Sequence, residues 1–149
     1  MSALEVKIRR LPGNADLPLP SYQTKDAVGM DVHAAVTSDL SIAAGEVVGI
    51  PCGFSMEVPP GHEAQVRPRS GLAAKNAISL ANTPGTIDPD YRGEVKILLI
   101  NHGKFPFVVT RGMRIAQMLV LPVPRVAWVE VEELPSTERG AGGFGHTGH

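Results

Sequence analysis

Cysteine is almost missing from this chain: Cys52 is the only one among 149 residues. One thiol cannot form an intrachain disulfide framework or a zinc site with several thiolate ligands, and it suits a reducing compartment. Cys52 lies in an apolar stretch, where a small buried hydrophobe explains it better than a nucleophile. No run approaches the ~20 apolar residues that cross a bilayer, and no apolar segment follows Arg9 and Arg10 near the start. We therefore expect a cytoplasmic protein with no membrane partner.

An excess of charge of either sign is missing as well. The 14 basic and 15 acidic residues leave a net charge of −1, and such a balanced field gives no reason to expect nucleic acid as a partner. The five histidines do not form an HExxH pattern, which argues against a catalytic zinc. Any anionic ligand must therefore be held by local groups.

Glycine and proline, in contrast, are abundant and interrupt each apolar run before a long helical pattern develops. The chain has 16 glycines and 13 prolines, and β-branched residues gather in short stretches between them. One short helix is predicted over Ser70–Asn76, with Ser70 as a possible N-cap. Many short strands in a chain of single-domain length indicate an all-β sandwich, jelly roll or barrel. The predicted strands cover residues 47–58, 62–67, 94–101, 106–109, 114–121 and 128–134.

The end of the chain differs in composition from the rest. After Leu134 the sequence is rich in glycine and almost free of aliphatic side chains, so it cannot bury enough surface to offset chain entropy. We therefore expect a β domain over residues 1–134 and a flexible tail over residues 135–149.

The tail contains GAGGFG, a formal match to the dinucleotide-binding glycine pattern. No strand precedes it and no helix can follow, which excludes the dinucleotide fold, and His146 stands where a P-loop needs lysine. A strip of backbone amides remains, together with Arg139, Phe144 and Thr147, and it is suited to wrapping polyanionic oxygens and laying one ring on a base. Composition alone favours a solubilising tail.

Acidic side chains gather in residues 85–101, GTIDPDYRGEVKILLIN. Asp88 and Asp90 lie at the entrance to a strongly β-forming run, where a carboxylate is suited to orienting or deprotonating water. Tyr91 offers a ring face and a hydroxyl group to a ligand. A polar turn with solvated acids is an equally good interpretation of this pattern.

Three further segments carry isolated polar groups. Arg69 and Ser70 lie beside a glycine at the start of the predicted helix, a corner that suits phosphate, although the pattern alone favours an ordinary helix cap. Asp31 is a single carboxylate suited to holding Mg²⁺ through water. Gln117 lies inside an apolar strand, where a structural hydrogen bond explains it equally well.

Jointly, five segments resemble the five ordered motifs of the trimeric dUTPase family, in both order and spacing. The resemblance extends over residues 27–148, and its third and fifth motifs are far more specific than any lone glycine pattern. The five segments are AVGMDVHAA (27–35), PRSGLAAK (68–75), NTPGTIDPDYRGEV (82–95), RGMRIAQ (111–117) and RGAGGFGHTG (139–148).

The resemblance implies an all-β, jelly-roll-like or β-clip subunit with at most one short helix. It also implies a homotrimer whose three active sites are each built from all three chains, with the glycine-rich tail closing as a lid over the bound nucleotide. The implied reaction is the Mg²⁺-dependent hydrolysis of dUTP to dUMP and pyrophosphate by water attack on the α-phosphorus. This reaction limits uracil in DNA and supplies dUMP for thymidylate synthesis.

Individual residues also acquire roles from the resemblance. Asp88 is implied to be the catalytic base that positions the water, and Asp31 to bind Mg²⁺ through water. The ring of Tyr91 is implied to exclude ribonucleotides, and Phe144 to stack on uracil. The substrate-binding residues implied by the motifs are Arg69, Ser70, Gly71, Asn82, Gly85, Thr86, Ile87, Tyr91, Lys96, Gln117, Arg139, Phe144, Gly145 and Thr147.

Three alternatives stay open at this point. A dCTP deaminase, including the bifunctional form that also hydrolyses dUTP, shares the fold and some phosphate-holding motifs, but the uracil hairpin and complete tail favour the pyrophosphatase. A nucleotide-sensing module would bind dUTP without turnover, and Asp88 argues against such a dead site. A structural, capsid-like jelly roll would require every motif to be a coincidence.

Overall fold

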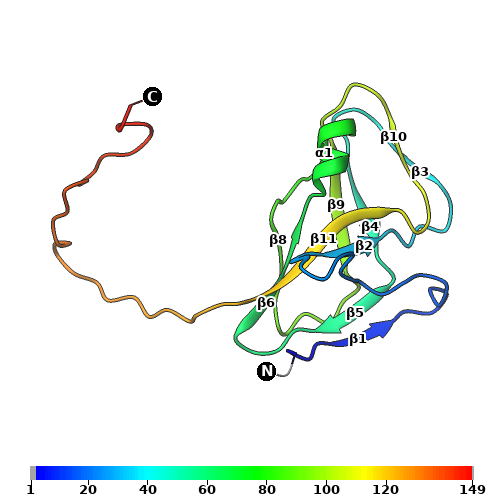
Figure 1. Cartoon of the computed structure of the whole chain (residues 1–149), viewed down its shortest axis with the longest axis horizontal. Coiled ribbons are helices and arrows are strands. Elements are labelled where there is room, and N and C mark those ends of the chain that lie inside the picture. The colour runs from blue at the N-terminus through cyan, green and yellow to red at the C-terminus, as the bar shows by residue number, and fades with distance from the viewer. Residues whose placement is uncertain (1–2, 149) are drawn as a thin grey trace.

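The computed structural model describes residues 3–148, which form eleven strands and one short helix around a single core, with a long C-terminal segment extending away from the body (Figure 1). His149, the last residue of the predicted tail, lies outside the described residues, as do Met1 and Ser2. The all-β prediction with one short helix is confirmed.

One antiparallel sheet carries Asp31, Gln117 and the Gly85–Ile87 segment, which the sequence singles out. Its strand order is β2-β11-β6-β8, so the long strand β11 is hydrogen-bonded on both sides. Gln117 pairs with Asp31 on one side and with Arg67 on the other, and directly opposed residues share a face of the sheet. The strands are β2 (Met30–His33), β6 (His62–Arg67), β8 (Gly85–Ile87) and β11 (Arg114–Pro122).

The other strands complete the body as three smaller antiparallel sheets. The strands β4, β9 and β7 pair in that order, while β1 pairs with β5 and β3 pairs with β10. These strands are β1 (Lys7–Arg10), β3 (Leu40–Ile42), β4 (Val47–Pro51), β5 (Phe54–Glu57), β7 (Ile78–Leu80), β9 (Lys96–Asn101) and β10 (Phe107–Val109).

A hydrophobic core joins the inner faces of these sheets. Alternation along β9 buries Ile97, Leu99 and Asn101 while Lys96 and Leu98 are exposed, as expected for a half-buried strand. The buried amide of Asn101 donates to the carbonyl oxygens of Ile42 and Phe105, and its own oxygen accepts from the Gly103 amide. Its hydrogen-bonding groups are therefore satisfied, as burial requires.

Cys52 belongs to this core. Burial, reinforced by the charge of Glu94, raises the pKa of its thiol to about 12. The thiol therefore stays protonated at neutral pH, and its interpretation as a small hydrophobe is confirmed.

The helix α1 (Ser70–Asn76) has the predicted bounds. Its N-cap is Arg69 and no side chain caps it, so the interpretation of Ser70 as the capping residue is wrong: Ser70 is already helical. At the other end Ala77 adopts a left-handed conformation, with φ of 54°, and its amide donates to the carbonyl oxygens of Ala73 and Leu72, which satisfies two helix-end acceptors.

Two strand predictions differ from the structure. The strand predicted over residues 47–58 is divided into β4 and β5 at Gly53, whose φ of +73° is left-handed and breaks the extended backbone. The strand predicted over residues 128–134 is wrong, because residues 123–148 contain neither strand nor helix. An alternating Val–Glu pattern needs a partner strand, and this segment has none within the part of the chain that the structure describes.

The N-terminal loop is tied to the turn before β11 by Arg111. Its guanidinium group bonds both carboxylate oxygens of Asp16, at 2.9 and 2.7 Å, and also donates to the carbonyl oxygens of Gly13 and Val36. The hydrogen bond from Arg111 lowers the pKa of the Asp16 carboxyl group. Within residues 3–148 no helix is long and apolar enough to span a membrane.

We predict that Asp16→Asn lowers the melting temperature at pH 7 by about a few degrees, since the ion pair is exposed. Because the folded-state pKa of Asp16 is depressed, its contribution is full above the unfolded-state pKa and is lost as pH falls through the folded-state value. Thermal unfolding of wild type and variant should therefore differ at pH 7, and the difference should shrink as the pH falls below the unfolded-state pKa of Asp16. A difference that is constant with pH would contradict this account.

Candidate functional site

Asp31 lies between two arginines at one end of the four-stranded sheet. Its Oδ1 is 3.3 Å from Nε of Arg69, and its Oδ2 accepts a hydrogen bond of 3.2 Å from Nη1 of Arg114. Arg69 also donates from Nη1 to the carbonyl oxygen of Arg114. We call Asp31, Arg69, Arg114 and Gln117 the Asp31 cluster.

A β-bulge in β11 brings this cluster together. Arg114 pairs with His33 and Ala116 with Val32, so one extra residue, Ile115, stands in β11. Without the bulge, strand alternation would turn Arg114 and Gln117 to opposite faces, because their positions differ by an odd number. The bulge places both on the face that carries Asp31.

Gln117 is held rather than free. Its amide donates to the carbonyl oxygen of Pro68, at 2.9 Å, immediately before Arg69. A side-chain carbon at Gly29 would overlap Oε1 of Gln117, so Gly29 allows the close approach of the first motif. Ser70 and Gly71 follow at the exposed first turn of α1. The first, second and fourth motifs therefore meet in one chain.

His33 borders the cluster on β2. Burial lowers the pKa of its imidazole, with Asp31 acting in the opposite direction and the two arginines of the cluster lowering it further. Its Nδ1 is buried without a hydrogen-bond partner. His33 is therefore neutral near pH 7 and adds no positive charge.

The third motif occupies a hairpin at the edge of the same sheet. Gly85, Thr86 and Ile87 form β8, and Thr86 is exposed opposite Gln65. A side-chain carbon at Gly85 would overlap a methyl group of Val66 and would approach the amide of Asn82. The backbone of Gly85 and the side-chain amide of Asn82 consequently lie close together in this hairpin.

Asp88 and Tyr91 belong to the turn that follows β8. Asp88 is exposed, and its carbonyl oxygen accepts from the Tyr91 amide at 3.2 Å. The Tyr91 hydroxyl donates to the carbonyl oxygen of Glu94, at 2.9 Å, and the ring packs close to Gly93. This fixes the ring while 45% of the residue stays exposed. Lys96, at the start of β9, is exposed and pairs through its backbone with Pro51.

The strand register separates Asp88 from the Asp31 cluster. Asp31 is level with Arg67 through Gln117, whereas Ile87 is level with Ala64. Three strand spacings across and about four residues along the sheet put Asp88 about 20 Å from Asp31 in one chain. A single chain therefore does not bring the two predicted parts together.

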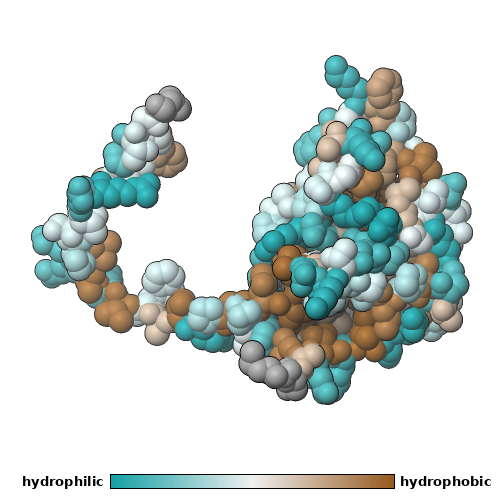
Figure 2. Space-filling view, viewed as in Figure 1, coloured by the Kyte–Doolittle hydropathy of each residue, from teal (hydrophilic) through white to brown (hydrophobic). Residues whose placement is uncertain are grey.

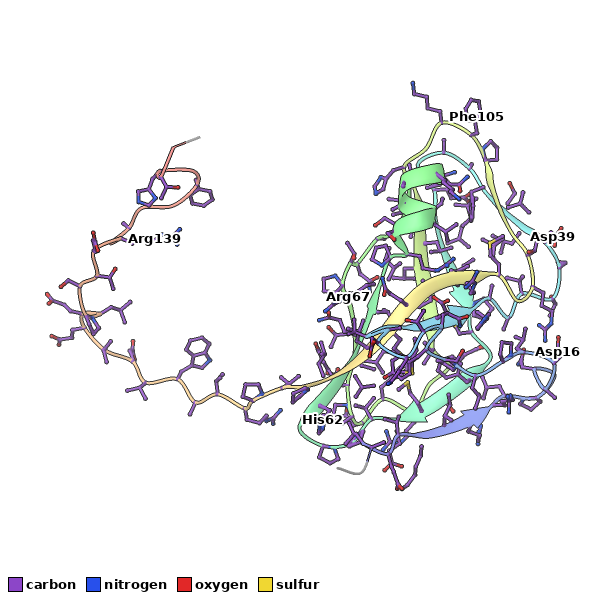
Figure 3. The ribbon with its side chains drawn as sticks, in the orientation of Figure 1. Asp16, Asp39, His62, Arg67, Phe105 and Arg139 are labelled. Carbon is purple, nitrogen blue, oxygen red and sulfur yellow. The ribbon has the colours of Figure 1, made fainter. Side chains whose placement is uncertain are left out.

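The fifth motif also lies apart from the body. Arg139 stands far from Arg67 of the sheet (Figure 3), and its Nε donates to the carbonyl oxygen of Gly142 within the tail. Phe144, Gly145 and Thr147 are exposed. None of the predicted tail residues reaches a site residue of its own chain.

The residues fit an indirect role toward a metal ion. No group of three or more His, Cys, Asp or Glu side chains within the described range could ligate one. Asp31 engages one arginine with each carboxylate oxygen, and a carboxylate has about four acceptor positions. Room remains for ordered water, which agrees with an outer-sphere role rather than direct ligation.

Arg114 is the functional candidate that the sequence prediction missed. It lies within the fourth motif, but strand alternation assigns it to the face opposite Gln117. In the sequence, Arg114 is marked only as a charged residue beside an apolar run. The bulge that redirects its side chain is not indicated by any sequence pattern.

The model of the dUTPase family matches residues 15–148. The deoxyuridine 5'-triphosphate nucleotidohydrolase of Rhizobium rhizogenes is 56% identical over 93% of this chain and 90% of that relative. The protein of the same name from Methylocella silvestris is 53% identical over 97% of this chain and 92% of that relative.

Solved structures share the fold. A variant of the dUTPase of staphylococcal phage 80alpha, in complex with dUpNHpp, superposes with a TM-score of 0.87 at 21% identity and covers 99% of this chain and 100% of that one. A mutant dUTPase of the S. aureus phage phi11, described with a structural Mg(II) ion, has a TM-score of 0.78 at 19% identity and covers 89% and 100%.

We predict that Gly85→Ala displaces β8, because the β-branched Val66 cannot turn away freely. The expected loss of unfolding free energy is about 1–3 kcal/mol, as for other overpacked sites, measured by urea denaturation. Gly49→Ala is the matched control, since its new methyl group would meet only Leu98 at an ordinary 3.5 Å. Equal stability of the two variants would contradict the tight contact.

Proposed function

The chain belongs to the dUTPase family and is a dUTP diphosphatase, and from this premise we propose that it splits dUTP with Mg²⁺ and a water molecule positioned by Asp88. The site is shared among the subunits of a homotrimer. The observation that carries this proposal is the separation of about 20 Å between Asp88 and the Asp31 cluster within one chain.

The Asp31 cluster is suited to the phosphate chain. Two guanidinium groups face one carboxylate, so the cluster keeps a positive charge, and guanidinium groups bind phosphate through paired hydrogen bonds. Ser70 and Gly71 add a hydroxyl group and backbone amides at the exposed first turn of α1. Gln117 completes the donors from β11.

Asp88 orients a water molecule for attack on the α-phosphorus and accepts its proton. The bond from the α-phosphorus to the oxygen bridging to the β-phosphorus then breaks, and pyrophosphate leaves with those electrons. The leaving charge is stabilised by Arg69 and by Arg139 of the lid. When bound, Mg²⁺ would neutralise the phosphate charge, and Asp31 would hold the ion through a water molecule.

A water activated by Asp88 must lie within hydrogen-bonding reach of its carboxylate. Within one chain, a gap of about 20 Å separates such a water from phosphates held by the Asp31 cluster. The cluster of one subunit and the hairpin of a second therefore form the site, and the tail of a third closes over it. Exposed hydrophobic residues along the extended segment between β11 and the tail support contacts with other subunits (Figure 2). They are Val126, Trp128, Val129, Val131 and Leu134.

The hairpin selects the nucleoside. Asn82 and the backbone of Gly85, Thr86 and Ile87 read the uracil edge, in a space closed by the contact of Gly85 with Val66. The fixed ring of Tyr91 excludes a 2′-hydroxyl group, and the backbone of Lys96 supports the hairpin.

The lid covers residues 135–149, beyond a domain of residues 1–134. Phe144 stacks on uracil, while Arg139, Thr147 and the amide of Gly145 bind the γ-phosphate. The reaction limits dUTP as a source of uracil in DNA and supplies dUMP for thymidylate synthesis. The lone thiol of Cys52 supports a cytoplasmic location.

We predict that two inactive variants complement each other. Asp88→Asn and a chain ending at Leu134 should each lose most pyrophosphate release from dUTP with Mg²⁺. In a coexpressed equal mixture about a quarter of the sites should combine an intact Asp88 from one subunit with a lid from another, and activity should return. Each variant expressed alone is the control. A mixture as inactive as its components would contradict the shared site.

Sugar selection has a separate test. Tyr91→Ala should admit UTP, with a rise of at least about tenfold in its kcat/KM relative to dUTP, because the ring no longer occupies the place of the 2′-hydroxyl group. Tyr91→Phe keeps the ring and should still reject UTP. Unchanged rejection by Tyr91→Ala would assign selection to another residue. Following ammonia from dCTP in the same assay tests the deaminase alternative.

A further inference from the structure

Arg114 contacts the Asp31 cluster through both its side chain and its backbone. Its Nη1 donates to Oδ2 of Asp31 and its carbonyl oxygen accepts from Arg69, each over 3.2 Å. The contact of Arg69 with this carboxylate is from Nε to Oδ1, at 3.3 Å. Two guanidinium groups therefore share one carboxylate, each with a different oxygen.

The burial of these groups is graded. The side chain of Asp31 is 12% exposed, that of Arg69 27% and that of Arg114 47%. The carboxylate is thus innermost and both guanidinium groups extend outward from it. A guanidinium has five N–H donors, so each arginine keeps donors that are not used by Asp31.

We propose that Arg114 is a positioning residue that keeps Arg69 available to the phosphates of the nucleotide. By holding Oδ2, Arg114 prevents Asp31 from pairing with Arg69 through both oxygens. The cluster then keeps one positive charge beside the phosphate chain. This role rests on the proposed function, because it concerns the same site.

The β-bulge supports this role. Inserting Ile115 into β11 breaks the regular ladder next to Arg114, and bulges next to active sites commonly redirect a side chain. Here the redirected side chain is the one that reaches Asp31.

Removing Arg114 has a specific consequence. In Arg114→Gln, Asp31 and Arg69 are left as a one-to-one pair, and the cluster loses its net charge. Binding should weaken in proportion to the phosphate charge of the ligand. The variant retains the backbone carbonyl group that accepts a hydrogen bond from Arg69, so the weaker binding is due to the side chain alone.

The test compares two ligands on the purified full-length protein by calorimetry. For Arg114→Gln, we expect a roughly tenfold weaker Kd for non-hydrolysable α,β-imido-dUTP with Mg²⁺ but at most about a threefold change for dUMP. The KM for dUTP should rise by a similar factor, and kcat should fall as well but by less, since Arg69 binds the phosphates before the reaction and also stabilises the leaving charge. Arg114→Lys restores the charge and should recover most of the affinity.

Arg9→Gln is the matched control, because it removes one positive charge from the exposed strand β1 and should bind both ligands as wild type does. Equal weakening of both ligands by Arg114→Gln would indicate a merely structural role and would overturn the proposal. So would Arg114→Lys binding as weakly as Arg114→Gln. Thermal unfolding shows whether Arg114→Gln is misfolded. If it is, the ratio of the Kd values of Arg114→Lys for α,β-imido-dUTP and dUMP tests the proposal. Absence of dUTP hydrolysis by wild type would instead reject the function on which the proposal rests.

Discussion

The ion pairing of Asp31 is the interaction on which the site depends. A carboxylate on a side chain that is 12% exposed loses most of its hydration, at an effective cost of several kcal/mol that only well-placed partners offset. Arg69 and Arg114 are those partners, and each comes from a segment whose backbone is fixed independently: one precedes α1 and the other precedes a bulge in β11. The fold thus commits two arginines to one acid, and the unmatched positive charge is what a polyanionic substrate can use.

The register of the four-stranded sheet imposes the second constraint. Because β11 is paired on both sides, the position of β8 relative to β2 cannot slide without turning the core face outward. The separation between Asp88 and the Asp31 cluster is therefore rigid, and no side-chain rotation closes it. Because this separation is rigid, the incomplete site of the single chain argues for assembly. The exposure of Trp128, 94% in the segment between β11 and the tail, supports the same conclusion.

Local patterns predicted those elements whose structure is decided locally. β6 and α1 have the predicted bounds, because alternation and a Leu-Ala-Ala run settle them. The short strands β2 and β8 were missed, since three or four residues carry too little periodicity. Arg114 was missed for a different reason: the bulge shifts the parity of β11, and this shift follows from pairing with a distant strand. The joint order of five motifs carried the functional prediction, which no single motif supported alone.

The amino-acid composition of the proposed lid makes its ordering depend on the bound ligand. Ordering the nine residues from Arg139 to Thr147 costs on the order of 10 kcal/mol of backbone entropy, and more for glycine than for other residues. The segment has almost no aliphatic surface to offset this cost, so contacts with a ligand must do so, through the stacking of Phe144 and the charged contacts with the phosphates. A triphosphate offers enough of them, whereas dUMP alone keeps a single phosphate. The lid is therefore expected to be ordered before the bond breaks and released afterwards, and the same poverty of hydrophobic residues that leaves it extended in the free chain makes product release favourable.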